Sequence, residues 1–132
     1  MKNTIFKILE YSYYFSLVSL FVLYLFPGSL IGYFLYGNLG QQPDLISNPI
    51  GTSINHLISF IYLSSLAFIM RVKERKYINS FQFLFFTSIL LEILHYFIPN
   101  RAFEYYDLFA NCIGIVLTYL LIQLILKNIN KN

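Results

Sequence analysis

Long apolar runs alternate with short polar connections along the whole chain. At 1.5 Å per helical residue, these runs are long enough, or nearly so, to cross about 30 Å of hydrocarbon. Short connections favour antiparallel neighbours. The pattern therefore predicts an all-α integral membrane protein, an antiparallel bundle of four transmembrane helices that forms one domain over residues 1–132. We place the helices at residues 8–34, 54–71, 78–98 and 107–127.

Two segments depart from this regular pattern. Pro27 and Gly28 interrupt the first apolar run, which predicts a kinked or ended helix with an interfacial extension, or alternatively a re-entrant segment. Residues 37–53 form the longest polar stretch, and their glycine, proline and asparagine content predicts an irregular loop.

The composition supports a membrane environment. The chain is 58% hydrophobic and carries only 11% charged residues, whereas a soluble domain has about 25%. Its mean hydropathy is +0.63. The net charge of +3 does not indicate a nucleic-acid partner, because the basic residues lie in short loops and at the chain ends and form no basic face. We therefore expect the lipid bilayer as the surroundings, and we expect the single cysteine, Cys112, to be a packing residue.

The basic residues also predict the orientation. Cytoplasmic connections of membrane proteins are enriched in lysine and arginine. With both termini in the cytoplasm, Arg101 is the only one of the nine basic residues on the outer side. The other eight are Lys2, Lys7, Arg71, Lys73, Arg75, Lys76, Lys127 and Lys131.

Polar side chains concentrate around the connection between the third and fourth predicted helices. Three of the six acidic residues lie there, in a chain that otherwise avoids charge. Polar groups at membrane depth are costly unless they are paired or used, so this region predicts a functional site on the outer side. The candidate ligand-binding or functional residues are His56, Glu92, His95, Arg101, Asp107 and Asn111.

Helical spacing places these residues on inward-facing stripes. Residues three, four, seven and eleven apart share a helix face. Small residues on such a face permit close approach, so we assign Gly114 and Thr118 to helix packing. From the first helix to the fourth, the stripes are Ser12, Ser16 and Ser19; His56, Ser59, Leu63 and Ala67; Ser88, Glu92 and His95, with Tyr96 alongside; and Asp107, Asn111, Gly114 and Thr118.

Simpler roles are open for individual members of this set. Glu92 lies within the outer leaflet, so it should be neutral, paired with Arg101, or bonded to His56 or His95. A Glu92–Arg101 pair could simply fix the connection to the bundle, and Asp107 could simply cap the last helix. No metal-ligand spacing or cofactor motif is present, so we expect neither a metal nor a cofactor.

Three elements carry a resemblance to a known family. They are E-x-x-H from Glu92, the P-N-R turn that ends at Arg101, and D-x-x-x-N-x-x-G from Asp107. Together they make residues 52–126 similar to the VanZ-like family. Four positions depart from its pattern. Thr52 and Ser53 replace an Asp-Lys pair ahead of His56, His95 replaces a glutamine, and Thr118 replaces a second glycine.

The resemblance implies a multi-pass protein of the bacterial cytoplasmic membrane and a role in the cell envelope. Founding members are associated with low-level resistance to the glycopeptide teicoplanin. We therefore favour a protein whose outer polar site binds a lipid-linked cell-wall precursor or a glycopeptide. The alternatives are a small hydrolase acting on a lipid phosphate or ester, a small transporter working as a dimer, and a structural partner whose helix stripes only pack.

Overall fold

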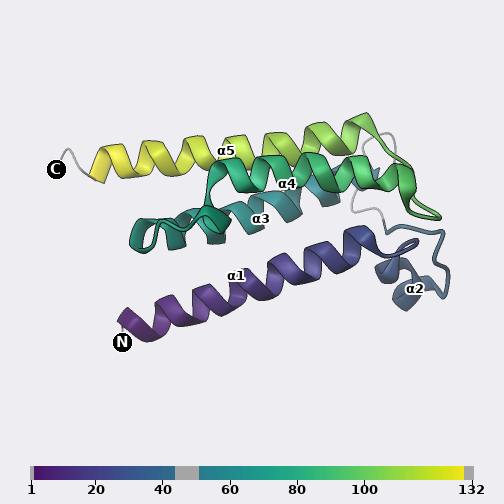
Figure 1. The fold of residues 1–132 in the computed structure, drawn as a ribbon, viewed down its shortest axis with the longest axis horizontal. Coiled ribbons are helices and arrows are strands. Elements are labelled where there is room, and N and C mark those ends of the chain that lie inside the picture. The colour runs from purple at the N-terminus through teal and green to yellow at the C-terminus, as the bar shows by residue number, and fades with distance from the viewer. Residues whose placement is uncertain (1, 44–50, 130–132) are drawn as a thin grey trace.

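The computed structural model describes residues 2–43 and 51–129, and within these ranges all regular structure is helical. The all-α prediction is confirmed for this part of the chain. The α-helices are α1 (Lys2–Leu25), α2 (Leu30–Tyr36), α3 (Gly51–Lys73), α4 (Phe81–Leu94) and α5 (Tyr105–Ile129), with 3₁₀ turns η1 (Tyr77–Asn79) and η2 (His95–Phe97) (Figure 1).

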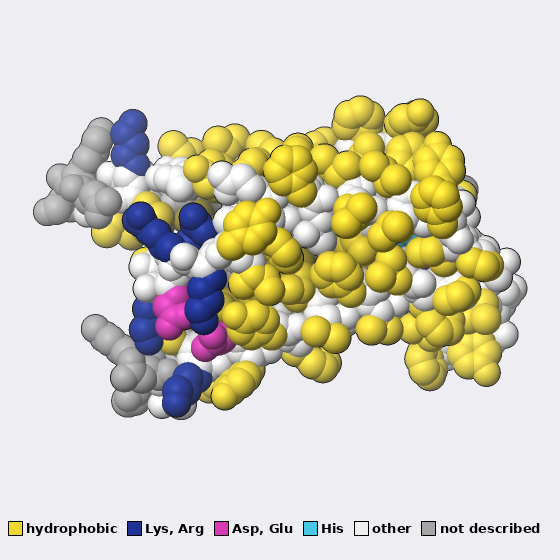
Figure 2. Space-filling model, in the orientation of Figure 1, with side chains coloured by type: hydrophobic (Ala, Val, Ile, Leu, Met, Phe, Trp, Pro, Cys, Tyr) yellow, Lys and Arg dark blue, Asp and Glu magenta, His cyan; other side chains and the backbone are white. Residues whose placement is uncertain are grey.

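Three of the described helices are long and apolar enough to cross a membrane. The qualifying stretches are Thr4–Leu25, Ser53–Lys73 and Tyr105–Ile129. The apolar stretch Phe81–Phe97 is shorter. It combines 14 α-helical residues with the three of η2, so it spans about 27 Å, slightly less than the hydrocarbon layer. Large hydrophobic side chains such as Phe15, Phe86 and Leu117 are exposed on these helices, and yellow side chains cover much of the visible face (Figure 2).

The first apolar run is divided into two helices, where the sequence pattern predicted one over residues 8–34. Proline lacks an N–H group and ends the hydrogen-bond ladder of α1. Gly28 then turns the chain with a φ of +89°, and Ser29 caps α2 by accepting a hydrogen bond from the Gly32 N–H at 2.9 Å. The kinked-or-ended alternative describes this region, and α2 is the short extension.

The other helix bounds differ by a few residues from those predicted. Helix α3 begins at Gly51 rather than at residue 54. Helix α4 begins at Phe81, because Ser80 caps it by accepting from the Phe83 N–H at 3.1 Å. Residues 44–50 of the predicted polar loop, and Lys131 of the predicted basic set, lie outside the described residues.

Helices α3 and α5 make the most extensive contact in the described structure. Gly114 on α5 lies against the backbone of α3, and a Cβ atom there would come within 2.9 Å of the Leu57 carbonyl oxygen. Thr118, one turn further along, is buried and donates a hydrogen bond to the Gly114 carbonyl at 2.8 Å. The polar stripe of α5 therefore faces α3 at close range.

Helix α1 packs through a different face from the one its serines indicated. Tyr13, Leu17, Leu20 and Tyr24 are its buried side chains, while Ser12, Ser16 and Ser19 are only half-buried. Helix α1 contacts α3 less extensively than α5 does, and large side chains fill its interface with the bundle. The serine stripe predicted for α1 is therefore not its main packing face.

The close α3–α5 contact leads to a first prediction. Replacing Gly114 with valine should lower the free energy of unfolding by about 1–3 kcal/mol, because the added atoms meet backbone that cannot move away. Thermal unfolding in detergent, followed by circular dichroism, measures this change. The matched control is Gly40→Val, since Gly40 is exposed and a Cβ atom there would lie 3.4 Å from its nearest neighbour, Asn38 Oδ1. Equal losses in the two variants would contradict the close-contact interpretation.

Candidate functional site

Five of the six predicted site residues are buried together at one end of the bundle. This is the end where α1 finishes, α3 begins, α4 finishes and α5 begins (Figure 1). Glu92 and Asn111 have no exposed surface. His95, Asp107 and His56 are exposed by only 3, 6 and 8%. The predicted site residues therefore form an interior cluster at this end, and among the six only Arg101, on the α4–α5 connection, is half-exposed.

Tyr24 links α1 to this cluster. Its hydroxyl oxygen lies 2.8 Å from His56 Nδ1 and 3.0 Å from Asn111 Oδ1. Its ring stacks on that of His95, with centroids 5.5 Å apart. One side chain of α1 thus contacts α3, the end of α4 and α5. The polar network is the set Tyr24, His56, Glu92, His95, Asp107 and Asn111.

Asp107 joins α5 to α3 within the polar network. Its Oδ2 atom lies 3.3 Å from His56 Nε2, and its Oδ1 atom accepts a hydrogen bond from the Ser53 hydroxyl at 2.5 Å. Asp107 lies in the first turn of α5, where the helix dipole favours a negative charge. The carboxylate therefore sits at a favourable helix end and also orients His56, which goes beyond the simple cap considered from the sequence.

The hydrogen bond between His56 and Tyr24 can run in either direction. A tyrosine hydroxyl has one hydrogen, so it can donate either to His56 Nδ1 or to Asn111 Oδ1. In the first case His56 carries its proton on Nε2, facing Asp107. In the second case His56 Nδ1 carries a proton and donates it to the tyrosine oxygen. A histidine held between a carboxylate and a hydroxyl in this way is equipped to move a proton.

Glu92 pairs with His95 rather than with Arg101. Its Oε1 atom lies 3.3 Å from His95 Nδ1 and accepts a hydrogen bond from the Glu104 N–H at 3.2 Å. His95 Nε2 lies 3.1 Å from the Tyr24 carbonyl oxygen, and because a carbonyl only accepts, Nε2 carries the hydrogen. The other Glu92 oxygen, Oε2, has no hydrogen-bond partner and lies 3.9 Å from His56 Nδ1.

Arg101 closes the end of α1. Pro99 and Asn100 form a tight turn in which Asn100 has a φ of +59° and the Arg101 N–H donates to the Ile98 carbonyl at 3.2 Å. This turn lets the guanidinium donate to the carbonyls of Leu23 at 2.5 Å and Phe26 at 3.3 Å. These carbonyls lie at the end of α1, where the helix leaves acceptors unsatisfied and carries partial negative charge.

Burial changes the electrostatics of the connection between α4 and α5. Loss of hydration lowers the pKa of Arg101 below its usual value, because burial disfavours the charged guanidinium. Partial burial raises the pKa of the Glu104 carboxyl, and the nearby Asp107 and Glu92 add to this effect. Arg101 makes no ion pair with a carboxylate among the described residues, so no direct partner neutralises its charge.

A cavity of about 100 Å³ borders the polar network. It lies between the end of α1, α2, α3 and the α4–α5 connection, and donor-bearing side chains converge on it. Ligand pockets for drug-sized molecules occupy about 300–1,000 Å³, so this cavity suits one polar group of a larger ligand. The polar residues that line it include Tyr24, Ser29, Asn55, His56, His95 and Arg101.

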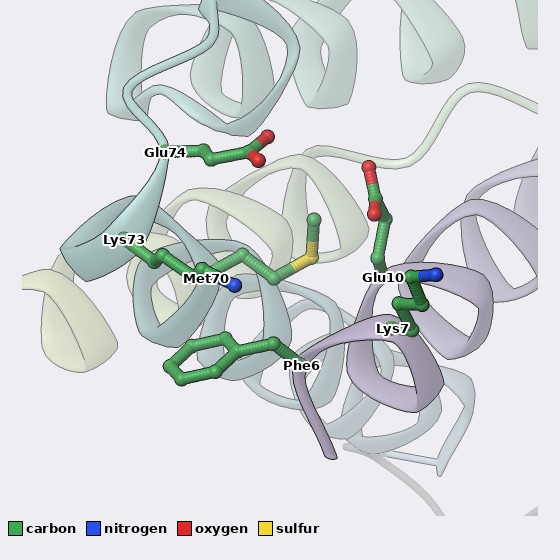
Figure 3. A pocket seen from close by; sticks show the side chains of 6 residues that line it. All are labelled: Phe6, Lys7, Glu10, Met70, Lys73 and Glu74. Carbon is green, nitrogen blue, oxygen red and sulfur yellow. The ribbon is translucent and has the colours of Figure 1, made fainter. Parts of the chain in front are cut away.

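A larger cavity, of about 330 Å³, lies at the opposite end of the bundle (Figure 3). It is formed by the start of α1, the end of α3 and the residue that follows it, and none of the predicted site residues lines it. Its charged side chains are of both signs, so it has no clear preference for a charged ligand. Its lining residues are Phe6, Lys7, Glu10, Met70, Lys73 and Glu74.

Sequence reasoning missed Tyr24 and Ser53. Tyr24 lies eleven residues after Tyr13, with Leu17 and Leu20 between them at helical spacing, and this periodicity could have identified the buried face of α1. Ser53 occupies a position noted only as a departure from a family pattern. Among the described residues, no group of three or more His, Cys, Asp or Glu side chains is arranged to hold a metal ion.

Fold and site together define the class: an all-helical membrane protein with a buried polar network at one end of its helices. The chain belongs to the VanZ/LLP1 family, whose model matches residues 14–126. The match begins within α1 and so includes Tyr24, which lies outside the 52–126 region that carried the resemblance in the sequence. No curated protein and no solved structure matches the chain.

The role of the Tyr24 hydroxyl leads to a second prediction. Tyr24→Phe should destabilise the protein by about 1–3 kcal/mol, because His56 and Asn111 each lose a buried hydrogen-bond partner. Thermal unfolding in detergent measures the loss. Tyr11→Phe is the control, since Tyr11 is on the same helix and is 72% exposed. A Tyr24→Phe variant as stable as the Tyr11→Phe variant would argue against an energetically linked network.

Proposed function

We propose that this VanZ-family protein crosses the bacterial cytoplasmic membrane four times, as an antiparallel bundle with both termini in the cytoplasm. Figure 1 supports this topology, because the start of α1 and the end of α5 lie at one end and the long helices alternate in direction. Lys and Arg side chains gather at that end (Figure 2).

In a Cys112→Ser background, an impermeant maleimide should label Ala102→Cys, but not Arg75→Cys, on intact cells. The reverse labelling would invert the topology.

Within this topology the polar network lies near the outer surface, and we propose that it serves a binding site. The observation that carries this proposal is the cavity of about 100 Å³ on which Arg101, His56 and His95 converge. A purely structural network is expected to satisfy its buried polar atoms. Here Glu92 Oε2 and Asn111 Nδ2 are buried without partners. Such groups cost stability, and this cost is in keeping with a binding role for the network.

The side chains that line the cavity favour a phosphate group as the part of the ligand that enters it. Arg101 supplies a planar fork of N–H donors suited to phosphate oxygens, and the two histidines can add further donors. The volume admits a phosphoryl group, while an attached sugar or peptide would remain outside. We therefore propose that the protein binds the phosphate-bearing headgroup of a lipid-linked cell-wall precursor, with the lipid chain in the surrounding bilayer.

A glycopeptide of the teicoplanin type is too large to enter this cavity and could contact only its rim. Resistance would then follow from binding of the precursor, in keeping with the association of founding members of the VanZ-like family with low-level teicoplanin resistance. Precursor binding is then the primary activity, and antibiotic resistance is its consequence in the cell envelope.

The proposal leads to a third prediction. Purified protein should bind a polyprenyl phosphate at least ten-fold more tightly than the polyprenol of equal length, as measured by native mass spectrometry from detergent. Arg101→Gln should weaken binding of the phosphate about ten-fold, because a charge-assisted hydrogen bond is lost. Lys7→Gln, which removes one positive charge at the opposite end of the bundle and lines neither this cavity nor the other basic groove, should bind like the wild type.

Arg101 also closes the end of α1, so a second variant separates binding from folding. His56→Gln should weaken phosphate binding while it retains the circular dichroism spectrum of the wild type.

In a glycopeptide-sensitive host, wild-type protein should raise teicoplanin tolerance, and Arg101→Gln and Asp107→Asn at matched membrane levels should not. Equal binding of polyprenol and polyprenyl phosphate would refute the headgroup site.

A second candidate function is a small membrane hydrolase. The specific observation in its favour is His56, held between the Asp107 carboxylate and the Tyr24 hydroxyl, an arrangement suited to general acid–base chemistry. Arg101 would stabilise negative charge that develops on a lipid phosphate or ester. Phosphate released from a lipid phosphate by purified protein, and abolished by His56→Gln, would support this function over binding alone. Intact substrate after prolonged incubation would exclude it for that substrate.

A further inference from the structure

The end of the bundle remote from the polar network carries a concentration of basic side chains (Figure 2). Some of this charge is compensated. Lys76 forms ion pairs with Glu74 at 2.8 Å and Glu10 at 3.2 Å. These contacts raise the pKa of Lys76 above its usual value, and Lys76 in turn lowers the pKa of Glu74. The acidic residues at this end are therefore already occupied.

In the described part of the chain, three basic residues on α3, the α3–α4 connection and α5 have no carboxylate partner: Arg71, Arg75 and Lys127. Arg71 uses one N–H group to donate to the Lys76 carbonyl at 3.1 Å. A guanidinium has five N–H donors, so most of its capacity remains available. The result is a local excess of positive charge on α3, the α3–α4 connection and the end of α5.

These charges border a long groove between α3, α4 and α5. The groove has a volume of about 730 Å³, and its lining includes both Arg71 and Arg75. Aromatic rings form much of its apolar part, since Tyr119 packs on Phe68 and Phe81 with centroids 5.6 and 5.0 Å away. A second hollow of about 560 Å³ continues along α5 to Lys127 and shares Arg75, Gln123 and Leu126 with the first.

We propose that this groove binds an anionic glycerophospholipid. Its phosphate would lie between Arg71 and Arg75, whose planar forks match phosphate oxygens, and Gln82 and Gln123 could contact the glycerol region. An acyl chain would lie over the apolar residues between the helices. Basic pockets between membrane helices are suited to acidic lipid headgroups. The combination of an apolar groove with a basic border selects a lipid over a free phosphate ion.

This site is independent of the proposed headgroup site, because the two lie at opposite ends of α3 and α5 (Figure 1). It would fix the bundle in a leaflet that contains acidic lipid, whichever ligand the polar network binds. It also accounts for the presence of two arginines, Arg71 and Arg75, on a groove with no acidic residue in its lining.

Native mass spectrometry of the full-length protein tests this proposal and forms a fourth prediction. Titrations would compare phosphatidylglycerol, phosphatidylcholine with the same acyl chains, and glycerol 3-phosphate. We expect phosphatidylglycerol to bind at least ten-fold more tightly than phosphatidylcholine. Arg75→Gln should weaken phosphatidylglycerol binding about five-fold, the effect of one basic residue near an acidic lipid.

The controls make each outcome decisive. Lys7→Gln removes one positive charge at the same end but outside the groove, and it should bind like the wild type. Lys127→Gln, an exposed position that cannot disturb the core, should weaken binding measurably if Arg75→Gln fails to fold. Equal binding of the two lipids, equal loss in Lys7→Gln, or tight binding of glycerol 3-phosphate alone would each overturn the proposal.

Discussion

Burial of ionisable side chains at one end of an apolar bundle is the constraint on which this structure depends. In a membrane each such group needs a partner within the protein, because lipid offers none. The polar network meets most of this need with side chains from α1, α3, α4 and α5, together with η2. A few interactions at one end therefore join four helices.

Packing and polar pairing support each other along α5. Gly114 allows α5 to approach α3, and this approach brings Asp107 within reach of His56 and Ser53. Arg101 then fixes the α4–α5 connection against the end of α1, which places Tyr24 beside Asn111. Helix α1 itself packs with large side chains, so its attachment at this end relies strongly on Tyr24 and Arg101. That dependence also keeps the cavity beside Tyr24 and Arg101 in shape.

Much of this arrangement could be predicted from the sequence. The apolar runs identified the helices, and the spacing of Asp107, Asn111, Gly114 and Thr118 identified a stripe that is buried throughout. The spacing could not show which partner Glu92 would choose, because three candidates lay within reach and the Pro99-Asn100 turn directs Arg101 elsewhere. The spacing also pointed to the serines of α1, and not to Tyr24, as the packing face of that helix. A stripe of small polar residues marks a packing face only where two helices approach closely, and α1 packs through large side chains instead.

The central claim is that the polar network is kept for ligand binding and not for folding alone. The most direct test is to measure unfolding free energy and polyprenyl phosphate affinity together for Glu92→Gln, which keeps the shape of the side chain but removes its charge. The account predicts stability within about 1 kcal/mol of the wild type, because the amide oxygen still accepts the Glu104 N–H bond. We expect affinity at least ten-fold weaker, because His95 and His56, which line the cavity, lose the carboxylate that lies 3.3 Å from His95 Nδ1 and 3.9 Å from His56 Nδ1. A variant that is strongly destabilised yet binds with wild-type affinity would contradict the account and leave the network a structural one.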